Sequence, residues 1–466
     1  MNSQTKDMTF AIKCFGCQMN KLDTALVASA LEEKGWARLE SVKQADAVII
    51  NTCSVRRHAE ERVLSHLGHL MHIKKTRPEL VVAVIGCMAQ RMGDQLLAHD
   101  AVDVVCGPAQ IPQLPDLIGH AMLQQSRAIR ITERIREAPR QDDESRLNDF
   151  ETIHSTAEQN LPAQAFVRIM RGCNNFCTYC IVPYVRGAEI CREPHAILDQ
   201  IKKLAETGTK QITLLGQTVN AYQYRTGAKT WSLADLLAAV AEIGGIEWIR
   251  FVTSYPTQEF FDDIMNVMAD SPKVCNYLHL PAQSGSNRIL KAMNRKYTAA
   301  GYLELIDRAR ATVPDIAIAG DFIVGFPGET DADFQDTVEL VKMARYKNTF
   351  IFKYSPRPGT TSDRRLADTV PPEVKQQRNS ELLAVQEGVS EQLSRHFLSQ
   401  TVQVLVEGPS KKSHINADGQ NNPQLVARTA TDWIVVFNGP ADLAGQFAEV
   451  RIVETSPLTL FGRLVQ

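Results

Sequence analysis

The sequence contains no apolar run that approaches the roughly 20 residues of a membrane-spanning helix. Its start, MNSQTKDMTFAIKCFG, lacks the basic segment, apolar stretch and small-residue cleavage site of a secretory signal. Neither membrane insertion nor secretion is expected, and the compartment indicated is the cytoplasm. The chain also lacks an excess of positive charge, since its net charge is −2. Any binding of nucleic acid must therefore depend on local basic patches.

What the chain does have is length and ten cysteines. At 466 residues, 44% of them hydrophobic, it exceeds what one hydrophobic core supports, and two to four domains are expected. In a reducing compartment, cysteines at short fixed spacings are metal ligands or catalytic thiols more often than disulfides. The cysteines are therefore the first candidates for function.

The hydrophobic pattern predicts an α/β protein. Residues 8–125 alternate short apolar runs with helical patterns, which is typical of a doubly wound parallel sheet. Residues 126–163 are rich in charge, and we expect a linker there. Residues 164–398 predict a partial (β/α)6 barrel with a long trailing helix, and residues 399–466 a small all-β barrel. The six expected barrel strands are Phe166–Met170, Ile212–Leu215, Trp248–Val252, Tyr277–Leu280, Ile316–Val324 and Phe350–Tyr354.

Three cysteines form a C-x3-C-x2-C loop just after the first expected barrel strand: Cys173, Cys177 and Cys180. Active sites of β/α barrels lie at this carboxyl edge. Three thiolates suit a cluster of four irons that keeps one iron open to a ligand. S-adenosylmethionine could chelate that iron, and one electron from the cluster would then break its sulfonium bond to give a 5′-deoxyadenosyl radical. The alternatives are a zinc site completed by another residue, or unrelated cysteines in a turn.

This loop resembles the signature of the radical S-adenosylmethionine superfamily, whose fold agrees with the expected barrel. Two glycine-containing strand ends could line the cofactor, because glycine allows close approach of the backbone to a ligand. Tight turns without a ligand explain these glycines equally well. The candidate cofactor-binding residues are Gly216, Gln217, Asp321, Gly325 and Glu329.

A second set of cysteines follows three apolar strands of the amino-terminal domain: Cys17, Cys53 and Cys87. In a parallel sheet the three would converge on one carboxyl edge, where they could hold a second cluster. Small buried cysteines at strand ends are the alternative. Geometry alone leaves Cys14 and Cys106 open as further ligands.

The segments Gly16-Cys17-Gln-Met-Asn20, Asn51-Thr-Cys53 and Gly86-Cys87 resemble the amino-terminal signature of methylthiotransferases. The resemblance implies an auxiliary 4Fe-4S cluster with three cysteine ligands. Cys14 stands where that pattern has threonine, and we interpret it as structural. The same interpretation applies to the other cysteines that match no ligand position: Cys106, Cys191 and Cys275.

The resemblance extends over nearly the whole chain and includes a carboxy-terminal domain similar to the RNA-binding TRAM module. Together with CNNFCTYCIVPYVRG and Gln283-Ser-Gly-Ser286, the motifs are most similar to the branch that acts on dimethylallyladenosine in tRNA. The family implies that one S-adenosylmethionine methylates sulfur at the auxiliary cluster. A second would provide the radical that removes hydrogen from carbon-2 of the adenine at position 37, next to the anticodon. That carbon has no useful acidity, so a positioned base would not suffice.

The resemblance further implies a sulfur donor, iron–sulfur assembly proteins and an electron donor such as flavodoxin or ferredoxin. The competing hypotheses are methylthiolation of a ribosomal-protein side chain or of another tRNA adenosine derivative, and a non-catalytic iron–sulfur protein that binds RNA. For RNA contacts the candidates are Lys411, Lys412 and Arg428, with Trp433 as a stacking surface. Solvated lysines and a core tryptophan are the alternatives for these residues.

Overall fold

The computed structural model describes residues 8–54, 57–133, 135, 141–155, 161–259, 261–411 and 422–465. The chain divides into two compact units. The first unit consists of Met1–Asn160, Met170–Asn174 and Cys180–Arg192, and the second of Leu161–Ile169, Asn175–Tyr179 and Glu193–Gln466. No helix among the described residues is long and apolar enough to cross a membrane.

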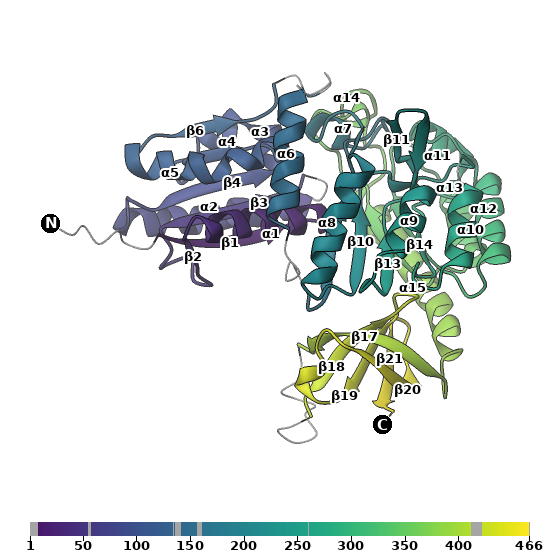
Figure 1. The fold of residues 1–466 in the computed structure, drawn as a ribbon. Coiled ribbons are helices and arrows are strands. Elements are labelled where there is room, and N and C mark those ends of the chain that lie inside the picture. Colours follow the sequence, from purple (N-terminus) through teal and green to yellow (C-terminus); the bar gives the residue numbers. More distant parts are fainter. Residues whose placement is uncertain are drawn as a thin grey trace. The chain divides into compact units, whose positions relative to one another are not determined.

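The described part of the first unit is built on a six-stranded parallel sheet in the order β2-β1-β3-β4-β5-β6, which confirms the doubly wound fold (Figure 1). Its strands are β1 (Thr9–Phe15), β2 (Ala37–Arg38), β3 (Ala47–Thr52), β4 (Val81–Gly86), β5 (Val104–Cys106) and β6 (Ala128–Arg130). Its helices are α1 (Gln18–Glu33), α2 (Arg57–Thr76), α3 (Cys87–Met92), α4 (Asp94–Leu97), η1 (Pro108–Gln113), α5 (Leu114–Gln124) and α6 (Gln141–Ile153).

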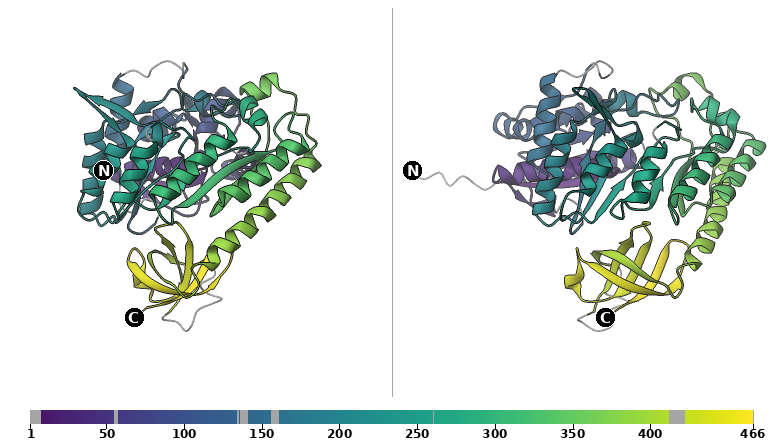
Figure 2. Two further views of the ribbon diagram at one scale, coloured as in Figure 1. Left: turned by 90° about the vertical axis from the view of Figure 1, so that its right-hand side faces the viewer. Right: turned by 45° about the vertical axis from the view of Figure 1, so that its right-hand side comes forward.

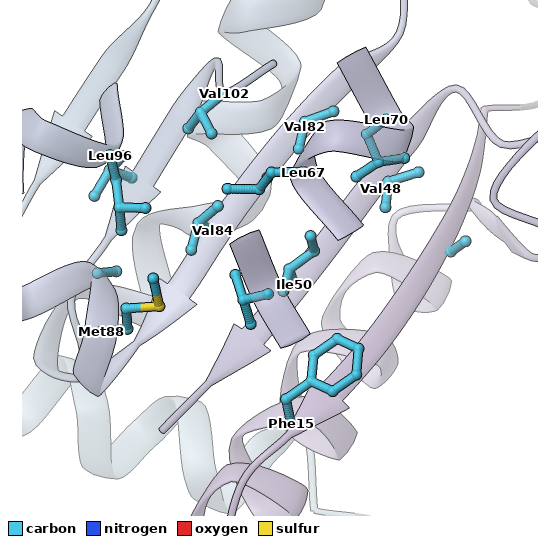
Figure 3. Close-up of a cluster of buried hydrophobic side chains, with 14 of the residues drawn as sticks. Phe15, Val48, Ile50, Leu67, Leu70, Val82, Val84, Met88, Leu96 and Val102 are labelled. Atoms are coloured by element: carbon cyan, nitrogen blue, oxygen red, sulfur yellow. The ribbon is translucent and has the colours of Figure 1, made fainter. Parts of the chain in front are cut away.

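The central strands β3 and β4 are buried along their whole length because helices cover both faces of the sheet. On one face, Leu67 and Leu70 of α2 pack on Val48, Ile50 and neighbouring strand residues (Figure 3). On the other face α1 contacts β1 and β3, and α5 contacts β4 and β5. Strands that are buried on both faces need continuous apolar runs rather than an alternating pattern, and β3 and β4 begin with such runs.

The linker expected over 126–163 is wrong in its described part. Ala128–Arg130 pairs with β5 as the sixth strand of the sheet, and Gln141–Ile153 forms a helix. The charge-rich sequence concealed a few buried contacts: Leu147 and Phe150 are buried, and Glu151 forms ion pairs with Arg171 and Arg192. The first unit also contains the short pair β8 (Met170–Arg171) and β9 (Ile190–Cys191), with α7 (Val182–Val185) between them.

The second unit contains the expected partial barrel. Its parallel strands form the sheets β13-β10-β7 and β14-β15-β16, joined by the backbone bond from Ser254 N–H to the His279 carbonyl. The strands are β7 (Gln164–Arg168), β10 (Gln211–Leu215), β13 (Trp248–Phe251), β14 (Tyr277–His279), β15 (Ala317–Val324) and β16 (Asn348–Lys353), within two residues of the predicted starts. The other elements are α8 (Pro194–Glu206), η2 (Val219–Ala221), β11 (Gln223–Thr226), β12 (Lys229–Ser232), α9 (Leu233–Ala241), α10 (Phe261–Asp270), α11 (Asn287–Ala292), α12 (Ala299–Thr312), α13 (Asp331–Ala344) and α14 (Thr361–Arg365).

The long helix α15 (Pro372–Arg395) packs on β16 and leads into the carboxy-terminal domain (Figure 2). There the chain closes into a barrel in the order β17-β18-β19-β21-β20, as predicted. The elements are β17 (Thr401–Pro409), β18 (Gln424–Thr429), β19 (Ile434–Asn438), η3 (Ala441–Leu443), β20 (Phe447–Thr455) and β21 (Thr459–Leu464).

A group of buried charges joins this small barrel to the strands of the larger one. The Lys347 ammonium forms an ion pair with the Asp432 carboxylate at 3.2 Å, and Arg428 reaches the same carboxylate at 3.1 Å. Arg250 donates to the Thr429 carbonyl at 2.6 Å. Burial of the ammonium lowers the pKa of Lys347 to about 8, although Asp432 opposes the shift. The single carboxylate of Asp432 therefore forms ion pairs with several cations.

We predict that Asp432→Ala loosens the small barrel, because the substitution leaves buried cations without their carboxylate. The expected cost is on the order of 3 kcal/mol, or roughly a hundredfold in the local opening equilibrium. Hydrogen–deuterium exchange of the β18 and β19 amides should accelerate accordingly. Asp442→Ala, which removes an exposed carboxylate from the same barrel, is the control and should leave exchange unchanged. Equal exchange in both variants would contradict the assignment.

Candidate functional site

The three amino-terminal cysteines follow three strands that are neighbours in the sheet, β1, β3 and β4. Cys17 is the N-cap of α1, Cys53 directly follows β3, and Cys87 is the first residue of α3. The Cys53 N–H donates to the Phe15 carbonyl at 3.1 Å, which ties the second turn to the first. The expected convergence on one carboxyl edge is confirmed by this topology.

Two buried asparagines lock these turns together. The Asn20 amide donates to the Asn51 side-chain oxygen at 2.8 Å and to the Thr52 carbonyl at 3.2 Å. The Asn51 amide donates in return to the Asn20 carbonyl at 2.8 Å. The Asn20 side-chain oxygen accepts from the Cys17 thiol at 3.3 Å. The asparagines of the GCQMN and NTC motifs therefore position the cysteines, a role that sequence reasoning missed.

The glycine before Cys87 is required by the same asparagines. Gly86 has φ of +95°, a conformation that favours glycine. A Cβ atom there would lie 2.5 Å from the Thr52 carbonyl oxygen and 2.7 Å from the Asn51 side-chain oxygen. The third cysteine turn can approach the second only without a side chain at this position.

Electrostatics at this edge favour thiolate at Cys17. A hydrogen bond from Cys53 lowers the pKa of Cys17 to about 5. The positive charge of Arg186 adds to this shift, and burial opposes it. Burial raises the pKa of Cys87, while Arg186 opposes that rise. The Arg186 Nε donates to the Cys87 sulfur at 3.2 Å. Thiolate is the form that binds iron, so this donor set suits a metal cluster.

The two further cysteines near this edge differ from the first three. Burial raises the pKa of Cys14, although a hydrogen bond with the Thr24 side chain opposes the shift. Cys106 ends β5, is fully buried, and has a pKa strongly raised by burial. Neutral thiols, half-buried at Cys14 and fully buried at Cys106, fit the structural role expected for both.

No three His, Cys, Asp or Glu side chains of the described residues are arranged to hold a single metal ion. A single ion needs its ligand atoms about 2 to 2.5 Å from one point. A four-iron cluster instead places each cysteine on a different iron. The fit to a cluster therefore depends on the chemistry and common edge of the three thiols.

The loop with the other three cysteines is anchored in each unit separately. In the first unit, the Cys173 N–H donates to the Gly187 carbonyl at 3.2 Å. Gly172, with φ of +68°, lies against the Ala188 carbonyl, where a Cβ atom would clash. In the second unit, the Thr178 N–H donates to the Met293 carbonyl at 3.0 Å.

Cys177 has a cationic partner of its own. The Arg295 guanidinium donates to the Cys177 sulfur at 3.3 Å and to the Pro281 carbonyl at 3.0 Å. It also lies over the Tyr255 ring, 4.5 Å from the ring centre. A partly buried guanidinium beside the sulfur offsets the negative charge that a thiolate brings into this site.

Two buried polar atoms at adjacent barrel strand ends lack a hydrogen-bond partner within the described part of the chain. They are the side-chain oxygen of Gln217, after β10, and the hydroxyl of Ser254, after β13. Gly216 beside Gln217 is buried. On β15, Asp321 is partly exposed and lies 3.3 Å from the His279 Nε2. These atoms fit a ligand that donates hydrogen bonds, as the amino and hydroxyl groups of S-adenosylmethionine do. Ser254 was missed because only glycine was used as a marker of strand ends.

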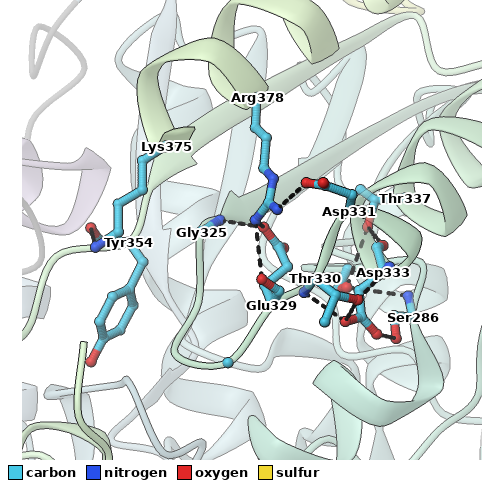
Figure 4. A network of polar contacts seen from close by, with 12 residues as sticks. Ser286, Gly325, Glu329, Thr330, Asp331, Asp333, Thr337, Tyr354, Lys375 and Arg378 are labelled. Carbon is cyan, nitrogen blue, oxygen red and sulfur yellow. Dashed lines mark hydrogen bonds and ion pairs between the residues drawn. The ribbon is translucent and has the colours of Figure 1, made fainter. Parts of the chain in front are cut away.

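Gly325 and Glu329 have partners within the protein (Figure 4). The Glu329 carboxylate accepts from the Gly325 N–H at 2.6 Å and from Arg378 of α15 at 2.8 Å. Gly325 has φ of +71°, and a Cβ atom there would collide with the Lys375 side chain. The close approach that this glycine permits is thus to α15, and the two residues shape the turn after β15.

The candidate RNA contacts have different surroundings. Lys411 is exposed, and Lys412 lies outside the described residues. Arg428 forms ion pairs with Glu407 at 2.9 Å and Asp432 at 3.1 Å. Trp433 is buried in the core of the small barrel, so its prediction as a stacking surface is wrong.

Comparison with protein families finds three matches. Residues 9–107 match "Uncharacterized protein family UPF0004", residues 167–341 match "Radical SAM superfamily", and residues 396–465 match "TRAM domain". Among solved structures, a radical S-adenosylmethionine methyltransferase, TsrM, from Kitasatospora setae with cobalamin and a 4Fe-4S cluster bound has a TM-score of 0.52. It is 15% identical and covers 77% of each chain, so the likeness concerns the fold.

Curated relatives match over almost the full length. A tRNA-2-methylthio-N(6)-dimethylallyladenosine synthase from Rhodopirellula baltica is 41% identical, with 100% of this chain and 96% of that protein covered. The enzyme of the same name from Porphyromonas gingivalis is 40% identical, with 98% and 94% covered.

We predict that Asn51→Ala destabilises the cysteine edge even without metal. The substitution removes the donor to Asn20 and leaves the buried Asn20 amide with fewer partners, at a cost of about 1 to 3 kcal/mol. In the metal-free protein, hydrogen exchange should accelerate in the first turns of α1. Ser29→Ala, a buried hydroxyl deletion later in α1 whose bond to Glu33 is long at 3.4 Å, is the matched control. Slow exchange retained in Asn51→Ala would refute the role of the asparagine pair.

The cap of α13 provides a pH-dependent prediction. Asp333 accepts from Ser286, Thr330 and Arg288, and although burial opposes it, these bonds hold its pKa well below the ordinary 3.8 (Figure 4). A lowered pKa stabilises the folded state above about pH 4, and this stability is lost as the pH falls toward the folded pKa. The difference in urea midpoint between wild type and Asp333→Asn should therefore shrink from about pH 5 to about pH 3. A constant difference would rule out this assignment.

Proposed function

Because the chain belongs to the family of the tRNA-2-methylthio-N(6)-dimethylallyladenosine synthases, we propose that it adds a methylthio group to carbon-2 of N(6)-dimethylallyladenosine at position 37 of tRNA. The observation that carries this proposal is the set of three cysteine turns at adjacent strand ends, locked by Asn20 and Asn51. A radical enzyme without this edge would have no second donor set for a cluster.

In this proposal the two cysteine sets have separate tasks. Cys173, Cys177 and Cys180 hold the cluster that binds S-adenosylmethionine, and they are the catalytic set. The amino-terminal set, Cys17, Cys53 and Cys87, holds the auxiliary cluster. When bound, the clusters and S-adenosylmethionine supply the electron, the radical and the sulfur chemistry that carbon-2 requires.

The residues at the barrel strand ends bind and orient S-adenosylmethionine. Gly216 lets the cofactor approach the backbone, and Gln217 and Ser254 accept hydrogen bonds from it, which gives their buried oxygens a partner. Asp321 accepts from a cofactor hydroxyl or from His279. Gly325 and Glu329 hold the turn beside this site through Arg378 rather than by contact with the cofactor.

The carboxy-terminal barrel binds tRNA in this proposal. Its candidate phosphate contacts are Lys411 and, outside the described residues, Lys412. Arg451 and Arg463 strengthen this view: they face each other across β20 and β21, are exposed, and have no carboxylate partner within the described chain. Directly opposed like charges are unfavourable unless an anion lies between them, and a phosphodiester supplies one. Arg428 contributes less, because Glu407 and Asp432 already neutralise it.

We further propose that the enzyme works in the cytoplasm. There it receives electrons from a protein such as flavodoxin or ferredoxin and its clusters from assembly proteins.

The decisive experiment compares tRNA from a strain that lacks the gene with tRNA from complemented strains. Mass spectrometry of digested tRNA should show loss of the methylthio nucleoside, build-up of dimethylallyladenosine, and recovery with the wild-type gene. Cys177→Ala should fail to restore it, whereas Cys275→Ala, a buried cysteine of the barrel core, should succeed. Unchanged methylthio levels in the deletion strain would shift the function to another tRNA adenosine derivative or to a ribosomal protein.

We predict different defects when each cysteine set is replaced. The reconstituted wild type should carry about eight irons, and either triple Cys→Ala variant about four. The variant without Cys17, Cys53 and Cys87 should still cleave S-adenosylmethionine to 5′-deoxyadenosine but form no methylthio product. The variant without Cys173, Cys177 and Cys180 should do neither. If the first variant kept eight irons, the auxiliary ligand assignment would be wrong.

A further inference from the structure

One buried arginine of the first unit contacts the amino-terminal cysteine set directly. The Arg186 side chain is only 6% exposed, and its Nε lies 3.2 Å from the Cys87 sulfur. Its Nη2 lies 3.5 Å from the Asp23 carboxylate, so the sulfur is the closer of the two partners. Cys87, Ile181 and Val185 pack together in a small apolar cluster beside this contact.

Asp23 balances the charge of Arg186, but the sulfur of Cys87 occupies the closer position beside the guanidinium. A guanidinium removed from water is costly unless it is paired and hydrogen-bonded. Asp23 is itself 1% exposed and neutralises the cation only at the longer distance. A thiolate at Cys87, or the sulfur of a cluster that Cys87 binds, supplies the close negative partner. The planar guanidinium can direct different N–H groups at the sulfur and at the carboxylate.

The same short segment also contacts the other cysteine set. Gly187, the next residue, accepts from the Cys173 N–H at 3.2 Å, and has φ of +81°. The dipeptide Arg186-Gly187 therefore reaches Cys87 through a side chain and Cys173 through a carbonyl, both within the first unit. Two sites that are 86 residues apart in sequence share one structural support.

We propose that Arg186 is a positioning residue of the auxiliary cluster: its guanidinium hydrogen-bonds the Cys87 sulfur and raises the reduction potential of the cluster bound there. The inference rests on the proposed function insofar as Cys87 is a cluster ligand. Reduction adds one negative charge to a cluster, and a nearby cation with an N–H on the sulfur stabilises that charge. Without the guanidinium, the reduced cluster loses this stabilisation, and the equilibrium shifts toward the oxidised cluster.

The test isolates one cluster by using full-length protein with Cys173, Cys177 and Cys180 replaced by Ala. After anaerobic reconstitution with iron and sulfide, the potential is measured by titration with dithionite and redox dyes, followed by electron paramagnetic resonance. In this background Arg186→Gln should shift the one-electron reduction equilibrium at least tenfold toward the oxidised state, which corresponds to about 59 mV. Arg186→Lys keeps the charge without the planar N–H group and should give a smaller shift in the same direction.

The matched control is Arg192→Gln. Arg192 lies in the same segment, is 2% exposed and pairs with Glu151 at 3.3 Å, so its replacement removes a buried arginine of similar environment. Its potential should equal that of the unsubstituted background. A shift in Arg192→Gln as large as that in Arg186→Gln would mean that the effect is general, and would overturn the proposal.

The outcomes separate this proposal from the ligand assignment. If the background protein with Arg186 intact binds no cluster, the assignment of Cys17, Cys53 and Cys87 fails, and this proposal fails with it. If the cluster forms but its potential in both Arg186 variants equals that of the background with Arg186 intact, only the role of Arg186 is overturned. If Arg186→Gln does not hold a cluster, Arg186→Lys decides: a lowered potential supports the proposal, and an unchanged potential overturns it.

Discussion

The reciprocal bond between Asn20 and Asn51 is the interaction on which the amino-terminal site depends. Parallel strands bring the ends of β1, β3 and β4 to one edge, but that alone aligns the backbone only roughly. The asparagine pair fixes the first turn to the second, and the missing side chain of Gly86 lets the third turn close on both. Three cysteines from distant parts of the chain thereby become one donor set.

Both cysteine sets use the same solution to the problem of buried negative charge. An arginine donates to one sulfur in each set: Arg186 to Cys87 and Arg295 to Cys177. The two cations are themselves stabilised differently, Arg186 by the Asp23 carboxylate and Arg295 by two tyrosine rings and the Pro281 carbonyl. A carboxylate partner reduces the positive field at the sulfur, whereas aromatic rings do not carry a full charge. The two sites are thus electrostatically distinct despite similar ligands.

The sequence predicted the features that repeat along the chain. Strand positions followed from apolar runs, and the cysteine sets from their spacing and their place after strands, so both barrels and the parallel sheet were found. The resemblance to methylthiotransferases is confirmed by relatives that match the whole chain.

Features that depend on a distant partner could not be predicted. Gly325 was expected to let the backbone approach the cofactor, whereas the neighbour it accommodates is Lys375, fifty residues later in α15. Arg428 looked like a free cation because Glu407 becomes its partner only when β17 and β18 pair, and Asp432 only when the chain turns between β18 and β19. The charge-rich segment after residue 126 resembled a linker because charged and polar residues dominate it, and the spacing of Leu147 and Phe150, which α6 buries, is too short a pattern to mark a helix.

The helix α15 has a consequence for how the second unit responds to load. Its first turns carry Lys375 and Arg378, which touch the Gly325 and Glu329 turn, and its last turn leads directly into the small barrel. A continuous helix of 24 residues is a stiff rod about 36 Å long. A force applied to the small barrel therefore reaches the end of β15 along this rod, in addition to the direct path through Lys347 and Arg250.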